Sequence, residues 1–166
     1  STIQSNTITT NGSSGYGIYL DTSSNSNIVQ SNNITTSGST GYGVFLFDNS
    51  NSNTLQSNTI TTNGSSGYGI YLYSSSNSNI SSNTITTSGS SGYGMYLIST
   101  VYKNLVYNNN ITTSNTNNYG IYLSRNAYNN TFYDNNITTK NMSGSYGIYL
   151  LDEAVNNTFY RNTISS

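Results

Sequence analysis

Cysteine, histidine, tryptophan and proline are all absent from this chain of 166 residues. Without cysteine there are no disulfides and no thiolate metal sites. Without histidine as well, the chain has no Ser-His or Cys-His nucleophile and no imidazole ligand for zinc or copper. The composition therefore predicts a protein with no cofactor and no metal ion, and it argues against an enzyme.

Charge is equally scarce, at 5% of residues with a formal net charge of −1. Such a weak field does not steer a protein toward nucleic acid or anionic lipid. No apolar run approaches the ~20 residues that span a bilayer, so we expect no membrane insertion. The chain opens on "STIQ" without a signal-peptide pattern, so any targeting segment lies outside this sequence. Abundant Asn, Ser, Thr and Tyr beside few Lys, Arg and Glu are typical of secreted proteins, and we expect an extracellular or cell-surface location.

The chain consists of one unit repeated about six times. The segment "SGYGIYL" at residues 14–20 returns in close copies at 41–46, 66–72, 91–97, 118–123 and 145–150. Self-similarity at a fixed period of roughly 20–50 residues indicates a repeat architecture. The isoleucine of the "NTITT" or "NNITT" element recurs every ~26 residues, at Ile8, Ile34, Ile60, Ile85, Ile111, Ile137 and Ile164.

Each period holds three short segments with strand-like alternation, divided by turn residues, and none shows the 3.6-residue period of a helix. In "YGIYL" the alternation points Ile18 and Leu20 to one side and Tyr19 to the other. One coil cannot bury its own apolar side, whereas coils stacked about 4.8 Å apart close a continuous core. We therefore predict an all-β fold, a β-solenoid of about six coils with three short strands per coil, in which residues 1–166 form a single domain.

The run "GIYLDTSSNSNIVQSNNIT" at residues 17–35 resembles the right-handed parallel β-helix repeat of the pectate-lyase-like superfamily, and especially NosD-like and adhesin-like surface proteins. The resemblance covers essentially the whole chain. It implies a right-handed parallel β-helix, a fold that carries lyases, hydrolases, binding proteins and structural proteins. The copper-related role associated with NosD proteins conflicts with the absence of His and Cys in this chain.

An asparagine precedes the Ile strand in every repeat. We expect these residues to hold a tight corner in the left-handed conformation and to hydrogen-bond from coil to coil as a structural ladder. The predicted ladder comprises Asn6, Asn32, Asn58, Asn83, Asn109, Asn135 and Asn162. A second asparagine set is expected to do the same at another corner, with the members Asn27, Asn53, Asn79, Asn104, Asn130 and Asn157.

Four of the few charged residues stand at equivalent positions of successive repeats, and this predicts their role. Arg125 and Asp152 occupy the same place in successive repeats, and so do Asp134 and Arg161, so both pairs are predicted to form ion pairs between coils. Asp21 and Asp48 follow the first two "YGIYL"-type strands, one offset apart. They are the best candidates for the paired carboxylates of a glycoside hydrolase or for a shared Ca²⁺, although two solvated turn residues are the simpler interpretation.

Outward-facing aromatic residues form an unbroken stripe. An exposed ribbon of this size indicates a contact surface, on which either sugar rings stack or a second copy of the chain packs. In the alternative interpretation, loops or the column beginning at Tyr16 fold over it. The stripe comprises Tyr19, Phe45, Tyr71, Tyr96, Tyr122 and Tyr149.

The two ends of the sequence lie in mid-coil without an obvious cap. This predicts either a segment of a longer solenoid or ends that pair head to tail with other copies. The leading functional hypothesis is a non-enzymatic extracellular structural protein that self-assembles into a filament, sheath or surface layer. The alternatives are a carbohydrate-binding or adhesin module, a polysaccharide lyase or hydrolase, and an ice-binding protein that uses the Thr-x-Thr pairs of Thr7, Thr59 and Thr84.

Overall fold

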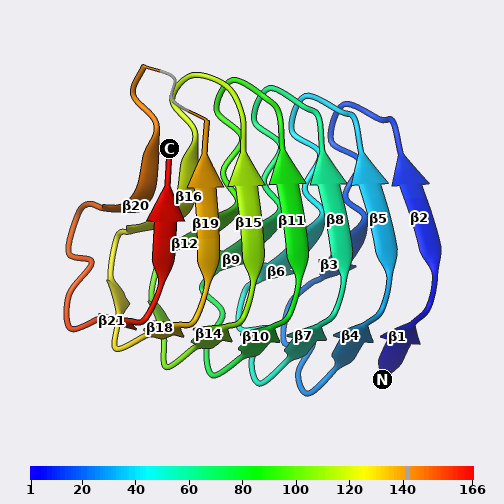
Figure 1. Cartoon of the computed structure of the whole chain (residues 1–166). Coiled ribbons are helices and arrows are strands. Elements are labelled where there is room, and N and C mark those ends of the chain that lie inside the picture. Colours follow the sequence, from blue (N-terminus) through cyan, green and yellow to red (C-terminus); the bar gives the residue numbers. More distant parts are fainter. Residues whose placement is uncertain (141–142) are drawn as a thin grey trace.

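The computed structural model describes residues 1–140 and 143–166. The chain winds into a parallel β-solenoid of about six coils, in which each coil adds one strand to each of three parallel sheets (Figure 1). The two termini lie at opposite ends of the row of coils. The predicted all-β solenoid is confirmed. No helix long and apolar enough to cross a membrane occurs in the described ranges.

The strands are short, and those of one sheet come from successive coils. The first sheet contains β1 (Thr2–Gln4), β4 (Ile28–Gln30), β7 (Thr54–Gln56), β10 (Asn79–Ser81), β14 (Leu105–Tyr107), β18 (Thr131–Tyr133) and β21 (Thr158–Tyr160). The second contains β2 (Thr7–Thr10), β5 (Asn33–Thr36), β8 (Thr59–Thr62), β11 (Thr84–Thr87), β15 (Asn110–Thr113), β19 (Asn136–Thr139) and β22 (Thr163–Ser165). The third contains β3 (Ile18–Leu20), β6 (Val44–Phe47), β9 (Ile70–Tyr73), β12 (Met95–Ile98), β16 (Tyr119–Ser124) and β20 (Tyr146–Leu150). A two-stranded sheet of β13 (Val101–Tyr102) and β17 (Ala127–Tyr128) is added at one corner.

The core is a set of in-register apolar columns. Ile18 pairs with Val44 and Val44 with Ile70, so identical positions of neighbouring coils face each other. Because side chains alternate across a strand, the residues on either side of these positions point outward. Burial of one aliphatic side chain contributes roughly 1.5–3 kcal/mol, and several of these positions are fully buried, among them Ile70, Leu72, Ile80 and Ile85. The predicted inward columns are therefore confirmed.

The predicted asparagine ladder is present. Asn58 donates from its backbone N (2.9 Å) and from Nδ2 (3.0 Å) to Oδ1 of Asn83, and its Nδ2 also donates to the Val29 carbonyl (2.9 Å). The expected left-handed backbone, however, falls one residue before each asparagine, for example at Ser31 (φ 54°) and Ser57 (φ 55°). The preceding residue makes the turn, and this leaves the asparagine side chain directed along the stack.

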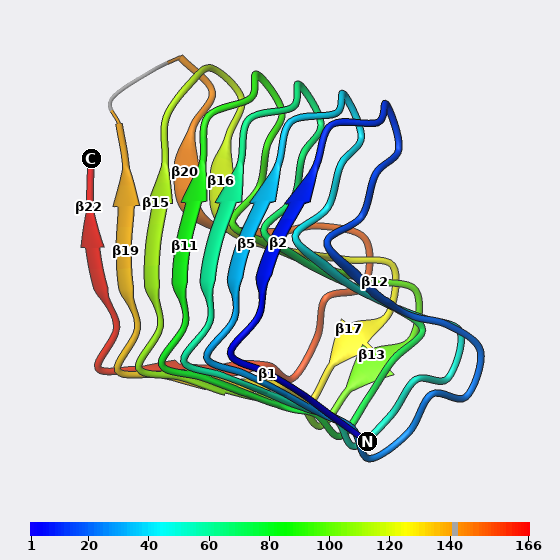
Figure 2. The ribbon, with the colours of Figure 1, turned by 90° about the vertical axis from the view of Figure 1, so that its right-hand side faces the viewer.

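The second asparagine column differs from the prediction in one coil. Ser78, and not Asn79, continues it: Asn53 N donates to Ser78 Oγ (3.2 Å), and Ser78 N donates to Asn104 Oδ1 (2.8 Å). Asn79 instead lies in β10, paired with Thr54 and Leu105. The reason is that the corner between Leu72 and Ser78 is one residue shorter than the corresponding corners of the other coils. Figure 2 shows the corners of the first coils extending farther out than the later ones near β13 and β17.

A glycine column allows the second and third sheets to meet closely. A Cβ added to Gly69 would collide with Cγ2 of Ile85 and lie 2.6 Å from the carbonyl oxygen of Gly94. A Cβ added to Gly43 or Gly94 would collide in the same way. Only glycine at these positions leaves room for the isoleucine of the next second-sheet strand along the chain. This explains the glycine that precedes each "IYL"-type strand.

Candidate functional site

The most extensive surface feature is a double row of aromatic rings over the third sheet, here called the aromatic face. Within each row the rings stack almost parallel at about the coil spacing, for example Tyr42 and Tyr68 at 4.9 Å and 3°. The last coil is the exception, with Tyr149 tilted by 40° from Tyr122. Between rows the rings meet edge to face, as with Tyr68 and Tyr96 at 81°. The inner row is Tyr19, Phe45, Tyr71, Tyr96, Tyr122 and Tyr149. The outer row is Tyr16, Tyr42, Tyr68, Tyr93, Tyr119 and Tyr146.

The inner row is less exposed than an open ribbon would be. Phe45 is 7% exposed and Tyr19 43%, while Tyr71, Tyr96, Tyr122 and Tyr149 are half-buried. The outer row, which begins at Tyr16, packs edge-on against it, with Tyr16 5.3 Å from Phe45 at 77°. The inner row is therefore partly covered by the column that begins at Tyr16, and its role as a contact surface stays a prediction.

The orientation of the rings limits what the aromatic face can bind. A sugar ring stacks on an open aromatic face, whereas each interior ring of a row has a neighbouring ring on both sides. Tyr68, for example, lies between Tyr42 and Tyr93, each 4.9 Å away. Ring edges and hydroxyl groups are what remain for a partner. The aromatic face is thus better suited to edge-on packing than to sugar stacking.

Burial keeps the tyrosine hydroxyls of this face protonated. Desolvation, with a smaller contribution from the negative charge of neighbouring tyrosinates, raises the pKa of Tyr68 and Tyr71 well above the ordinary value of 10.0. The same causes raise the pKa of Tyr93 to about 12. At neutral pH these hydroxyls are uncharged and can both donate and accept hydrogen bonds.

The two predicted ion pairs behave differently. Arg161 binds Asp134 in bidentate fashion, with Nε to Oδ1 and Nη2 to Oδ2 both at 2.7 Å, and its hydrogen bonds lower the pKa of Asp134. The expected pair of Arg125 with Asp152 does not form; the Asp134–Arg161 pair is the salt bridge found in the described ranges. Burial raises the pKa of Tyr71, and the charge of Arg125 offsets this shift only in part.

The candidate carboxylates Asp21 and Asp48 follow neighbouring strands of the third sheet, and their role as a catalytic pair stays a prediction. Leu20 pairs with Leu46, so Asp21 stands opposite Phe47 and Asp48 stands one position later. Asp21 accepts a hydrogen bond from the Thr22 hydroxyl (2.9 Å), and Asp48 accepts one from Asn49 Nδ2 (3.0 Å). In the part of the chain that the structure describes, no group of three or more His, Cys, Asp and Glu is placed to hold a metal ion.

The second sheet presents a different outward surface, made of Thr and Asn. Thr59 pairs with Asn33, and Thr61 with Thr35, so the polar positions form rows along the rod. Asn136 Nδ2 donates to Asn110 Oδ1 at 3.1 Å, which joins two of the asparagines that interrupt the Thr-x-Thr pattern. Ice binding at this surface stays a prediction.

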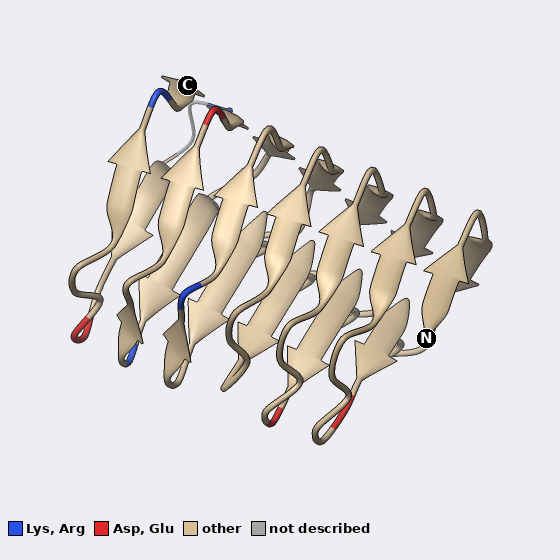
Figure 3. Cartoon of the chain, turned by 90° about the horizontal axis from the view of Figure 1, so that it is seen from below, with Lys and Arg blue, Asp and Glu red and all other residues tan. Residues whose placement is uncertain are grey.

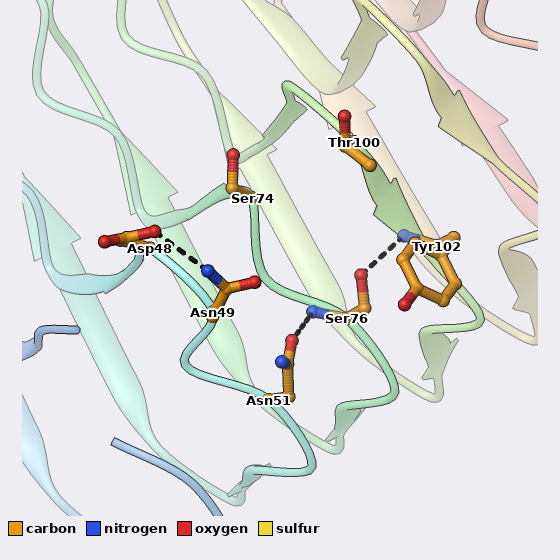
Figure 4. Close-up of a pocket in the computed structure, with 7 residues that line it drawn as sticks. All are labelled: Asp48, Asn49, Asn51, Ser74, Ser76, Thr100 and Tyr102. Carbon is orange, nitrogen blue, oxygen red and sulfur yellow. Dashed lines mark hydrogen bonds between the residues drawn. The ribbon is translucent and has the colours of Figure 1, made fainter. Parts of the chain in front are cut away.

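One feature was missed from the sequence: a polar hollow of about 270 Å³ at the corner of the third coil, here called the notch (Figure 4). The step from Ile60 to Ile85 is one residue shorter than the steps on either side, and this was the available signal. Asp48 lines the notch, whereas Asp21 does not. The residues around it are Asp48, Asn49, Asn51, Ser74, Ser76, Thr100 and Tyr102.

The register, the core columns and the asparagine ladder agree with a family comparison. A family model described as "Right handed beta helix region" matches residues 1–164. The chain belongs to the right-handed β-helix family. Comparison with curated proteins and with solved structures gave no match. Because β-helices include both enzymes and proteins without catalytic activity, family membership leaves the function of this β-helix to be argued from its surface.

Proposed function

We propose that this β-helix is a non-catalytic structural protein of the cell exterior that self-associates side by side through its aromatic face. The observation that carries the proposal is the pair of stacked aromatic rows, which run over every strand of the third sheet and stay partly exposed. Aromatic residues are enriched at protein interfaces because they combine a large apolar area with a polar group.

The repeat distance of the rings favours a second copy as the partner. Neighbouring rings lie 4.9 Å apart at Tyr42 and Tyr68 and 4.7 Å apart at Tyr96 and Tyr122. A second copy offers the same spacing, so the rows of ring edges on two parallel rods stay in register along the whole length. A partner with a different period loses this register within a few coils.

Electrostatics supports close approach of copies. The four basic and five acidic residues all lie outside strands, and Figure 3 shows them at the corners of the rod, with the strands free of charge. Faces without like charges approach one another without repulsion, and a net charge near zero promotes association. Two rods that pair through this face form a closed dimer, and such dimers are the units of a sheath or surface layer once a second contact joins them.

Sedimentation velocity over a range of protein concentrations, with electron microscopy of the same samples, tests the proposal. We expect concentration-dependent assemblies of aligned rods. Tyr96→Lys places a charge in the inner row and is expected to abolish them, whereas Thr84→Lys, on the second sheet and about half a coil away, leaves them intact. Circular dichroism checks that both variants remain folded. A wild-type protein that stays monomeric at every concentration, or equal loss in both variants, contradicts the proposal.

A further inference from the structure

The notch exists because one corner is too short to fill its place in the stack. Backbone hydrogen bonds align Asn51, Ser76 and Tyr102 in successive coils: Ser52 N donates to the Ser76 carbonyl, and Asn77 N donates to the Tyr102 carbonyl, both at 3.0 Å. Ser76 is thus a small side chain between two larger ones. Figure 4 shows Asp48, Asn49 and Asn51 on one side of the hollow and Thr100 and Tyr102 on the other.

Hydrogen bonds to the backbone fix the walls of the notch. Ser76 N donates to Asn51 Oδ1 (2.6 Å), and Tyr102 N donates to Ser76 Oγ (3.0 Å). Ser74 Oγ donates to the Ser99 carbonyl at 2.8 Å. The side chains of Asn51, Ser74 and Ser76 are therefore held in place, which reduces the entropic cost of binding a ligand.

Tyr102 differs from the interior rings of the aromatic face. One side of its ring stacks on Tyr128, at 5.2 Å and 11°. The previous coil contributes Ser76 at the equivalent place, so none of the aromatic rings that the structure describes stacks on the other side of Tyr102. The chain thus has, in the middle of the rod, an aromatic ring with one face directed toward a polar hollow.

The polar groups at the notch can both donate and accept. Asn51 uses its Oδ1 for the backbone of Ser76, and among the described residues its Nδ2 has no hydrogen-bond partner. Ser76 Oγ accepts from Tyr102, which leaves its own proton to donate. Asp48, whose Oδ1 already accepts from Asn49, supplies a further carboxylate oxygen.

We propose that the notch binds one neutral sugar residue. A sugar ring offers an apolar C–H face to the open side of Tyr102 and hydroxyl groups to Asn51, Ser76 and Asp48. Ligand pockets commonly measure about 300–1,000 Å³, so a hollow of about 270 Å³ admits a single ring. The carboxylate of Asp48 repels uronic acids and other anionic sugars. This site lies outside the aromatic face and does not depend on self-association.

Titration of ¹⁵N-labelled protein with neutral monosaccharides, their linear tetrasaccharides and glucuronate tests the proposal by NMR. We expect at least one neutral sugar, at millimolar concentration, to shift the backbone amides of Ser76 and Tyr102, while glucuronate does not. Equal binding of a monosaccharide and its tetrasaccharide indicates a free sugar or a chain end, and tighter binding of the tetrasaccharide indicates a residue within a glycan.

Single substitutions distinguish sugar binding at the notch from binding elsewhere on the rod. Tyr102→Ala is expected to weaken binding about tenfold or more through loss of the stacking surface. Ser76→Tyr continues the Tyr102–Tyr128 stack into the hollow and is expected to abolish binding. Tyr160→Ala removes a stacked ring of the first sheet near the other end of the rod and should leave the Kd within about twofold, because Tyr160 packs against Tyr133 and does not line the notch.

Two results would overturn the proposal. One is the absence of amide shifts at the notch with every neutral sugar of the panel. The other is binding that survives Ser76→Tyr in a protein with unchanged circular dichroism. Because Ser76→Tyr leaves the aromatic face intact, a failure of this proposal is distinguishable from a failure of self-association, which sedimentation measures separately.

Discussion

Asn58 and Asn83 are joined by two hydrogen bonds to the same atom, since the backbone N and Nδ2 of Asn58 both donate to Oδ1 of Asn83. Each asparagine accepts from one neighbour and donates to the next, so the ladder runs the length of the rod. Both side chains are buried, at 1% exposure. Loss of one member therefore strands donors and acceptors on both neighbouring coils.

Asn83→Ala is expected to lower the free energy of unfolding by about 3 kcal/mol, because it leaves buried donors of Asn58 and the Leu55 carbonyl without partners. Urea unfolding followed by circular dichroism measures the change. Asn110→Ala, at an exposed position on the second sheet, is the control and should stay within about 0.5 kcal/mol of wild type. Equal effects would show that the ladder is not a main source of stability.

Gly69→Ala is expected to destabilise the protein by about 2 kcal/mol or more, since the added methyl group meets Ile85 and the Gly94 carbonyl oxygen in a packed core. Thermal unfolding measures the shift in Tm. In Gly12→Ala the nearest atom lies 3.9 Å from the new Cβ, so Tm should barely change. A tolerated Gly69→Ala would mean that the two sheets can move apart.

Alkaline pH is expected to destabilise the fold because it removes the phenolic protons of the tyrosines in the aromatic face. The neutral phenol is favoured in the fold, so the pKa values of Tyr68, Tyr71 and Tyr93 are raised above 10.0. The unfolded state loses its phenolic protons first, and stability is full below pH 10.0 and falls as pH rises toward the Tyr93 value of about 12. Absorbance of tyrosinate and circular dichroism should change together. Titration of all tyrosines at the ordinary value in a folded protein would contradict the buried stacks.

The Asp134–Arg161 pair should be visible in an NMR titration of the Asp134 carboxyl group. Its pKa is expected below the ordinary value of 3.8 because Arg161 donates two hydrogen bonds to it. The pair therefore adds stability above pH 3.8, which is lost as pH falls through the lowered pKa. Arg161→Gln should return the Asp134 pKa toward its ordinary value, and Arg125→Gln should leave it unchanged. The effect on global stability is small, since the pair is exposed.

The repeat allowed most of the fold to be predicted. With a side-chain period of two and a fixed spacing between coils, the positions of Ile18, Leu20 and Ile34 on the inside follow from the pattern alone. The asparagine ladder followed for the same reason. Asn79 was assigned to the wrong column because the corner before it is one residue shorter than in the other coils, so that Ser78 takes the corner position and Asn79 moves into β10. Asparagine recurs at several places in each repeat, and this concealed the shift in the sequence.

The repeat pattern of the sequence does not predict the direction in which each side chain points. Sequence spacing placed Tyr16 and Tyr19 in separate columns, but the edge-to-face packing that half-buries the inner row depends on rotamers. Equivalent register positions brought Arg125 and Asp152 to successive coils without determining where a long, flexible guanidinium points. The notch arises from a missing residue, which no motif records.

The short corner between Leu72 and Ser78 has a consequence for a molecule made of near-identical units. The core columns and the asparagine ladder recur in each turn, so a ligand or partner that recognises these repeated features alone can bind equally well at successive coils. The shortened turn breaks this equivalence of the coils, and it gives the repeated core a position along the rod axis that differs from its neighbours.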